Sequence, residues 1–249
     1  MTFSEAIEKN LYAFPPFHAW SRAEGYDGPD LLWTICDIPA PYFNRVGRAN
    51  LRDDEADVAI AAAIARARAK NVPLMWWVGP STRPAGLGER LVAHGFRHTT
   101  DLSGMAAELE EGQTASPVPG LHIEHVRDRE MLRAWNVGFL MDFPEERYAF
   151  YAEHFDASFR HYIGSIDGVR VAVSTLFFGG GIAGIYSVYT VEALRGRGIG
   201  AALTRAAMND AYELGHRSAV LVARPDASGL YARLGFVEKC RFATYVWEA

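Results

Sequence analysis

Cysteine is scarce in this sequence. Only Cys36 and Cys240 occur among its 249 residues, and neither has a neighbour at the spacing of metal ligands. A disulfide-rich scaffold and a zinc ribbon both need more cysteines than this, so the sequence excludes both classes. We expect the two residues to be buried thiols. His122 and His125 flank an expected strand without a third ligand, so we expect no metal site.

Long apolar runs and an excess of positive charge are also missing. No apolar stretch approaches the roughly 18 residues that a membrane-spanning helix needs. The start, "MTFSEAIEKN", carries acids early and lacks the basic residues and apolar stretch of a secretory signal. We therefore expect a cytoplasmic protein that does not bind membranes. The formal net charge of -5 disfavours a general nucleic-acid binder, which needs a basic surface to displace counterions.

The overall composition is that of a globular enzyme. Hydrophobic residues make up 49% of the chain and charged residues 22%. The length suits one large domain or two of about a hundred residues each. A polar, proline-bearing segment, "EGQTASPVPG", separates two halves that each contain helix and strand patterns. We therefore expect domains at residues 1–113 and 121–249.

Apolar periodicity predicts the elements of the first half. Residues 53–73 begin with acids, end with basic residues and stop at Asn71 and Pro73, which indicates a helix aligned with its own dipole. A short apolar strand, "PLMWWVG", follows. The segment "ERLVAHGF" then predicts a short helix that runs into Gly95 and Phe96.

The second half gives clearer patterns. Asp167-Gly168 joins two strand-like runs within residues 158–178 and is the strongest hairpin signal in the chain. Gly215 stands where a helix needs a left-handed C-terminal cap. Further strands are expected at residues 121–126, 182–191, 218–223 and 242–247, the last of them closing this half, and helices at residues 127–140, 200–214 and 227–236.

Two stretches, "RPAGLG" and "RGRGIG", share the spacing of an arginine and two glycines found in phosphate-binding loops. Such a loop needs backbone N–H groups that point one way, glycines that let the backbone approach the anion, and a following helix whose positive end faces it. The stretch that begins at Arg195 lies between an expected strand and an expected helix of about fifteen residues. The one that begins at Arg83 precedes only about two turns of helix, and Pro84 removes one donor.

A weak internal repeat also distinguishes the two glycine stretches. Both halves end a helix at Gly-Phe, at residues 95–96 and 235–236. "RPAGLG" lies 7 to 12 residues before Gly95, whereas "RGRGIG" lies 35 to 40 residues before Gly235. The same distance before Gly95 falls at residues 55–60, at the start of the expected helix, where the first half carries acids and no glycine loop. A glycine loop alone is also typical of a tight strand-to-helix connection, but this context favours "RGRGIG" as the anion-binding loop.

The segments "VYTVEALRGRGIGAAL" and "VLVARPDASGLYARLGF" resemble the GNAT superfamily of acyl-CoA-dependent N-acyltransferases. The resemblance covers residue 121 to the C-terminus, and the first half resembles a degenerate copy. It implies an α/β (α+β) fold of two tandem GNAT-like domains, each a mixed, mostly antiparallel sheet flanked by helices. The domain at residues 1–113 would be the degenerate one and that at 121–249 the catalytic one.

The same resemblance implies site residues and acetyl-CoA as the co-substrate. Tyr231 would be the general acid that protonates the departing thiolate. The pantetheine arm would bind Val188, Tyr189 and Thr190. The pyrophosphate would bind Arg195, Gly196, Arg197, Gly198, Ile199, Gly200 and Ala201. Leu91 occupies the register of Tyr231 in the first half, and Arg224 stands where the family often has asparagine.

The acceptor side is less defined. The strand "GIAGIYSVYT" contains no carboxylate, so no general base is identified. The acids of "MDFPEERY", Asp142, Glu145 and Glu146, suit an ammonium group, although a run of charges is usually the solvated face of a helix. A second group, Trp76, Trp77 and Phe96, either lines an acceptor pocket or fills the core of the first half.

These features predict an N-acetyltransferase that moves the acetyl group of acetyl-CoA to a small-molecule or peptide amine by direct attack. The missing carboxylate favours an alternative, a non-catalytic acyl-CoA binding or sensing protein. A longer acyl donor or an alcohol acceptor is a weaker alternative. The internal duplication is compatible with either a monomer or a homodimer.

Overall fold

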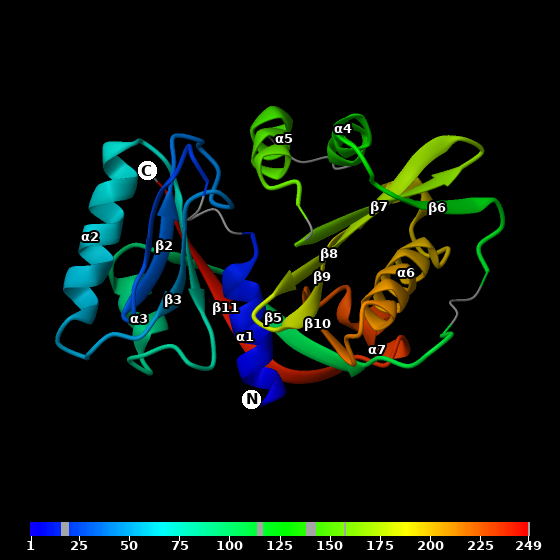
Figure 1. Cartoon of the computed structure of the whole chain (residues 1–249). Helices are drawn as coiled ribbons and strands as arrows, with labels where there is room; N and C mark the ends of the chain where they lie inside the picture. Colours follow the sequence, from blue (N-terminus) through cyan, green and yellow to red (C-terminus); the bar gives the residue numbers. More distant parts are fainter. Residues whose placement is uncertain (16–19, 114–116, 138–142, 157, 249) are drawn as a thin grey trace.

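Strands dominate the computed structural model, which describes residues 1–15, 20–113, 117–137, 143–156 and 158–248 (Figure 1). The helices are α1 (Phe3–Ala13), α2 (Ala56–Ala69), α3 (Leu87–Ala93), α4 (Arg129–Val137), α5 (Pro144–Glu153), α6 (Ile199–Glu213) and α7 (Ser228–Arg233). The strands are β1 (Glu24–Asp27), β2 (Leu31–Ile35), β3 (Arg45–Ala49), β4 (Leu74–Val78), β5 (Arg97–Glu108), β6 (Leu121–His125), β7 (Phe159–Ile166), β8 (Val169–Gly179), β9 (Ile182–Thr190), β10 (Ser218–Ala223) and β11 (Val237–Trp247).

All of these strands belong to one mixed sheet, in the order β1-β2-β3-β4-β11-β5-β10-β9-β8-β7-β6. Within it, β3 pairs with β4 and β9 with β10 in parallel, while the other neighbours run antiparallel. The expected fold class, a mixed and mostly antiparallel α/β arrangement, is confirmed. None of the helices in the described ranges has the length and apolar character of a membrane span.

The last strand lies elsewhere than the sequence suggested. We expected it to close the second half, but β11 inserts between β4 and β5, both from the first half, and pairs with each in antiparallel fashion. β5 in turn pairs with β10 of the second half. In Figure 1 the red strand runs from α7 to the side of the molecule that carries α2. The division into domains at residues 113 and 121 therefore stays a proposal, since the sheet is continuous across it.

The two halves nevertheless repeat one order of elements. In the first half it is β3, α2, β4, α3 and β5, and in the second it is β9, α6, β10, α7 and β11. Both short helices end in the same way: the amide of Phe96 donates to Leu91 O (3.0 Å), and that of Phe236 donates to Tyr231 O (3.1 Å). The preceding glycines, Gly95 and Gly235, have φ of 89° and 96°. The internal repeat is confirmed.

Helix α1 lies across the junction of the halves (Figure 1). A capping box between Thr2 and Glu5 starts it. The buried amide of Asn10 donates to Gly179 O (2.7 Å) and Ile182 O (2.9 Å) in the second half. Glu8, also buried, accepts hydrogen bonds from the amide and hydroxyl of Ser81 in the first half. The helix thus fixes the turn between β8 and β9 relative to β4.

The hairpin between β7 and β8 forms at the residues that the sequence indicated, and one apolar core contains side chains of both halves. Asp167 and Gly168 join β7 to β8 with φ of 50° and 74°, as the hairpin signal required. One apolar cluster combines side chains of both halves, and in it Trp20 packs edge-on against Phe150 with ring centroids 5.7 Å apart. Cys36 is buried and Cys240 half-buried, and both are free thiols.

His161 on β7 makes the stability of this fold depend on pH. The side chain is 1% exposed, and its Nδ1 lies 2.9 Å from Thr175 Oγ1. Burial lowers the pKa of His161 from 6.5 to about 3, so the unfolded chain binds this proton between pH 6.5 and 3 and the folded chain does not. As far as this group is concerned, the free energy of unfolding is highest above pH 6.5 and decreases as the pH falls toward 3.

We therefore expect His161→Gln to weaken the pH dependence of unfolding. Between pH 6.5 and 5, the range above the titration of most carboxylates, this single proton contributes a slope of up to about 1.4 kcal/mol per pH unit. Urea unfolding at several pH values measures the slope, and an equal slope for both proteins would contradict the assignment.

Candidate functional site

The segment between β9 and α6 presents a row of unused backbone donors. The amides of Leu194 and Arg195 donate to Val191 O and Glu192 O, and that of Ala202 donates to Gly198 O. The amides of the intervening residues 196–201 donate to no residue in the described ranges. These six consecutive N–H groups lie in an exposed loop and the first turn of a fifteen-residue helix, which is the arrangement that binds phosphates.

Two glycines give this loop its shape. Gly196 and Gly198 have φ of 79° and 84°, in the left-handed region that favours glycine. A Cβ added to Gly196 would meet no atom within 4 Å, so the backbone there is open to a ligand. Arg195 Nε donates to Thr190 O (3.2 Å) and so joins the loop to the end of β9, whereas Arg197 is exposed.

Strands β9 and β10 separate next to this loop. They pair only at Ala183–Ala219 and Gly184–Val220, and β9 continues beyond that point without β10. Opposite β8, the pairing of β9 is interrupted by a bulge at which Ser187 has φ of 55°. In the described residues, β10 therefore does not pair with the part of β9 that was predicted to bind the pantetheine arm.

The predicted site residues come together around Gly200. A Cβ added there would lie 3.7 Å from Val188 Cγ1 and from Thr190 Oγ1, and 3.5 Å from Leu230 Cδ1. The start of α6, the end of β9 and α7 therefore meet at this point. Ala201 and Val188 also pack against the same apolar cluster as Leu230 and Tyr231.

Tyr231 is half-buried on α7. Its ring packs edge-on against Phe236, with centroids 6.0 Å apart. Burial raises the pKa of Tyr231 to about 12, so the hydroxyl stays protonated at neutral pH and is able to donate a proton. Leu91, its counterpart in the first half, is fully buried and has no such group.

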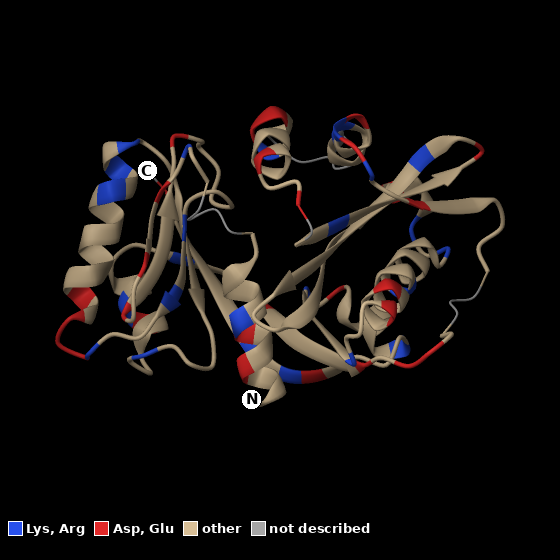
Figure 2. Ribbon diagram, in the orientation of Figure 1, with Lys and Arg blue, Asp and Glu red and all other residues tan. Residues whose placement is uncertain are grey.

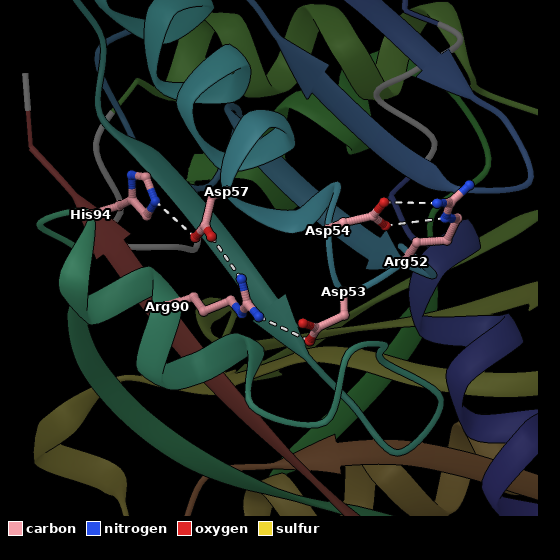
Figure 3. A network of polar contacts seen from close by, with 6 residues as sticks. All are labelled: Arg52, Asp53, Asp54, Asp57, Arg90 and His94. Carbon is pink, nitrogen blue, oxygen red and sulfur yellow. Dashed lines mark hydrogen bonds and ion pairs between the residues drawn. The ribbon is translucent and has the colours of Figure 1, made fainter.

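The helix start of the first half carries its own anions. Asp53 and Asp57, which flank the start of α2, bind Arg90 at 2.9 and 2.7 Å, and Asp57 lies 3.1 Å from His94 Nε2 (Figure 3). Nearby, Asp54 pairs with Arg52 at 2.7 Å. Figure 2 shows acidic residues at one end of α2 and basic residues at the other. Carboxylates thus occupy the place that corresponds to the glycine loop before α6.

The other glycine stretch serves as a packed connection between β4 and α3. The amide of Arg83 donates to Ala49 O (3.0 Å), and its carbonyl accepts from the amide of Leu51 (3.2 Å). Gly86 is the N-cap of the seven-residue α3. The prediction that this stretch belongs to a different structural element is confirmed.

A cavity of about 240 Å³ opens where the two halves meet. Two arginines from opposite halves reach its wall, Arg45 from β3 and Arg147 from α5, and the strand bulge contributes Tyr186 and Ser187. The other lining residues are Leu11, Phe14, Pro15, Tyr42, Met75, Trp77, Leu102, Trp135, Tyr151 and Val222. In the described part of the chain, no group of three or more His, Cys, Asp or Glu side chains is placed to hold a metal ion.

Residues 128–236 match the model of the acetyltransferase (GNAT) family. This part of the chain is a GNAT domain. At least 90% of the chain is similar in fold to proteins of solved structure that include the following three. It is 20% identical to a GCN5-related N-acetyltransferase from Kribbella flavida, with 99% of this chain and 96% of that chain covered and a TM-score of 0.74.

The second of these is a tandem GNAT protein from the clavulanic acid biosynthesis pathway, at 16% identity, with 99% of this chain and 94% of that chain covered and a TM-score of 0.64. The third is a GCN5-related N-acetyltransferase from Sphaerobacter thermophilus, at 19% identity, with 90% and 82% covered and a TM-score of 0.63. No curated protein matches the chain. Because these similarities cover the first half as well, they support the expected fold of two tandem GNAT-like domains.

Of the described residues that were considered for the acceptor side, only Trp77 lines the cavity. Glu145 is exposed and pairs with Arg133 at 3.0 Å. Glu146 does not line the cavity, and Asp142 lies outside the described residues. Trp77 lines the cavity, whereas the other two aromatic residues, Trp76 and Phe96, pack together in the core of the first half.

Sequence reasoning missed the arginines of the cavity. Arg45 and Arg147 are more than 100 positions apart, and no spacing pattern links them. One local signal was available for Arg147: Phe150 and Tyr151 follow it three and four positions later, on the same face of α5. An arginine on an apolar helix face is a sign of a buried charge, which is rare unless the charge is paired.

We expect Gly198→Asp to lower the affinity for acetyl-CoA by about 100-fold. The new carboxylate would stand among the amides that, in the predicted site, each donate a charge-assisted hydrogen bond of roughly 1.5–3 kcal/mol to the pyrophosphate. Aspartate tolerates the left-handed backbone at this position. Isothermal titration calorimetry measures the affinity.

Gly86→Asp is the matched control in the other glycine stretch. Its φ is -86°, and an added Cβ would meet no atom within 4 Å. We expect this variant to bind acetyl-CoA normally. Equal affinities of the two variants would contradict the assignment of residues 195–201.

Proposed function

We propose that the chain is an N-acetyltransferase that moves the acetyl group of acetyl-CoA to an amine. The observation that supports this most strongly is the row of six unused amides at the start of α6, inside a GNAT domain. In this proposal residues 195–201 bind the pyrophosphate, and Val188, Tyr189 and Thr190 offer backbone groups to the pantetheine arm. Tyr231 is the general acid.

The chemistry is a direct transfer without an acyl-enzyme. The nitrogen of a neutral amine attacks the carbonyl carbon of the thioester, and the carbon–sulfur bond breaks. The sulfur takes the proton of the Tyr231 hydroxyl, and the nitrogen releases a proton to water. A backbone N–H at the end of β9 polarises the carbonyl oxygen, which is the site of developing negative charge.

The position of the cavity supports a role in acceptor binding. Tyr186 and Ser187 line it, and the proposed pantetheine-binding residues follow directly on the same strand. An acceptor in the cavity would therefore lie at the end of the pantetheine arm. The acceptor would be a small-molecule amine, and the free thiols suit a cytoplasmic location.

One observation favours the alternative of a non-catalytic acyl-CoA binding protein. Among the described residues that line the cavity there is no aspartate, glutamate or histidine to take a proton from the amine. Release of free coenzyme A in the presence of an amine panel separates the two functions, because a binding protein takes up acetyl-CoA without turning it over.

For a general acid, Tyr231→Phe should lower kcat by about 100-fold while leaving the affinity for acetyl-CoA unchanged. Because the pKa of Tyr231 is about 12, the wild-type kcat should show no loss between pH 7 and 10 that depends on this residue. A thiol-release assay at saturating acceptor measures both quantities.

Tyr212→Phe serves as the control for this substitution. Tyr212 lies near the end of α6 that is remote from the loop, where Arg217 stacks over its ring at 4.4 Å. We expect this variant to keep the wild-type kcat. If Tyr231→Phe also keeps it, Tyr231 has no part in the chemistry.

A further inference from the structure

Apolar side chains form most of the wall of the cavity where the two halves meet. Apolar atoms make up most of the surface that is exposed inside it. Met75 and Trp77 line the cavity from β4, Leu102 from β5 and Val222 from β10, and Leu11 adds an apolar side chain from α1. Such a wall gains free energy when an apolar group of a ligand replaces the water next to it.

The strand register explains why these side chains meet. Trp77 pairs with Thr244 of β11. Leu102 pairs with Phe242, two positions earlier on the same strand. Because paired residues project to the same face and side chains alternate along a strand, Trp77 and Leu102 share one face of the sheet. Val222 belongs to this face as well, since it pairs with the second residue after Leu102. Three strands from both halves thus build one continuous apolar surface.

The two arginines of the wall bond to oxygen atoms of the chain. Arg45 Nη2 donates to Phe14 O (2.9 Å) and Pro15 O (2.7 Å). Arg147 donates through Nε to Asn136 Oδ1 (2.8 Å) and through Nη2 to Asn136 O (2.7 Å). The donors in these bonds serve the protein's own structure and are occupied before an acceptor binds.

Tyr186, which lines the cavity from β9, is held in a similar way. Its hydroxyl donates to the side-chain oxygen of the buried Asn10 (2.6 Å). Its ring stacks on Phe14, with centroids 3.7 Å apart and an angle of 10° between the planes. Aromatic surface in a fixed position therefore lies directly before Ser187, the residue of the strand bulge.

We propose that the acceptor is a small primary amine with an apolar substituent, and that the cavity binds this substituent. The inference rests on the proposed acetyltransferase function and specifies its acceptor. Ser187 also lines the cavity, and the residues proposed for the pantetheine arm follow it along β9. We expect the substituent to lie against Trp77 and Leu102 and the nitrogen to face Ser187, where the thioester would end.

The volume of the cavity limits the size of the substituent. It is about 240 Å³, below the roughly 300–1,000 Å³ of pockets for drug-sized ligands. An apolar cavity of roughly 150 Å³ holds one benzene molecule. The space therefore suits a phenyl ring on a two-carbon arm, or a short alkyl chain. A sugar or a polyamine would leave polar groups without hydrogen-bond partners against this wall, which costs free energy.

Matched amines that differ at one ring or chain position test the apolar requirement in the wild-type protein. In the thiol-release assay, 2-phenylethylamine is compared with 2-(pyridin-4-yl)ethylamine, and butylamine with 2-methoxyethylamine. We expect kcat/KM to be at least about 10-fold higher for the apolar member of each pair, because the extra nitrogen or oxygen of the other would be buried without a partner. The polar members are the weaker bases, so such a preference cannot arise from amine protonation. Equal or faster reaction of the polar members overturns the proposal.

A binding measurement covers the case in which no amine of this panel reacts. Calorimetry compares 2-phenylethanol with 2-(pyridin-4-yl)ethanol, in which an uncharged hydroxyl replaces the amine, on the protein with and without coenzyme A. The first alcohol should bind at least about 10-fold more tightly than the second. No uptake of 2-phenylethanol at about 10 mM, roughly an upper limit for a specific subsite, overturns the proposal, as does equal uptake of the two alcohols.

Substitutions that keep the size of a wall side chain locate the subsite. Met75→Gln keeps the length of the side chain and adds an amide, so it should lower the apolar-to-polar ratio of kcat/KM, or of affinity, at least about fivefold. Val58→Gln, on the exposed surface of α2, is the control and should leave this ratio unchanged.

The ratio also separates binding from folding, because a loss of folded protein lowers both rates equally. If Met75→Gln does not fold, Val222→Thr replaces it, since threonine has nearly the shape of valine and adds a hydroxyl to the same wall. An unchanged ratio in the folded variant overturns the assignment of this wall to the acceptor.

Calorimetry with acetyl-CoA distinguishes failure of this inference from failure of the proposed function. No uptake of acetyl-CoA refutes the acetyltransferase itself. Uptake and turnover of amines without preference for the apolar members refute only the acceptor class.

Discussion

The backbone hydrogen bonds of β11 to β4 and β5 hold both halves of the chain in one sheet. Because this strand comes from the second half and both of its partners come from the first, the halves cannot separate without breaking two antiparallel ladders. The cavity depends on this arrangement, since Trp77 on β4 and Leu102 on β5 face a space that Tyr186 and Ser187 on β9 close from the other half. Helix α1 reinforces the junction through Asn10 and Glu8.

The two copies of the repeat have the same order of elements, but different groups stand at the start of their first helices. In the second half, α6 begins after glycines, has no acid in its first turn and leaves six amides available. In the first half, α2 begins among four acidic residues at positions 53–57, and its dipole is balanced by them. The difference lies in a few residues before each helix, while the strands, the short helices and the Gly-Phe ends are retained. Backbone amides without a protein acceptor therefore stand before the first helix of one copy and carboxylates before that of the other.

The sequence was sufficient for what depends on neighbours along the chain. The Asp167-Gly168 hairpin, the strand β10 and the helix α6 follow from turn chemistry and apolar periodicity, and the Thr2–Glu5 capping box was an unused signal for α1. The position of β11 was not predictable, because an alternating strand fits many neighbours equally well. The cavity was missed for a related reason: only the tertiary fold brings Arg45 and Arg147 to the same cavity wall. The roles of Tyr231 and of residues 195–201 in binding and catalysis stay predictions.

The acids at the start of α2 also let the first copy balance its charges within the chain itself. Arg90 and His94 face carboxylates that are part of the chain, so the first copy remains electrically balanced when no coenzyme is present. In the second copy, the amides of residues 196–201 have no acceptor in the described part of the chain. Since the sheet is shared, any ligand that binds the folded form of one copy would stabilise the entire molecule against unfolding, including a half that it never touches.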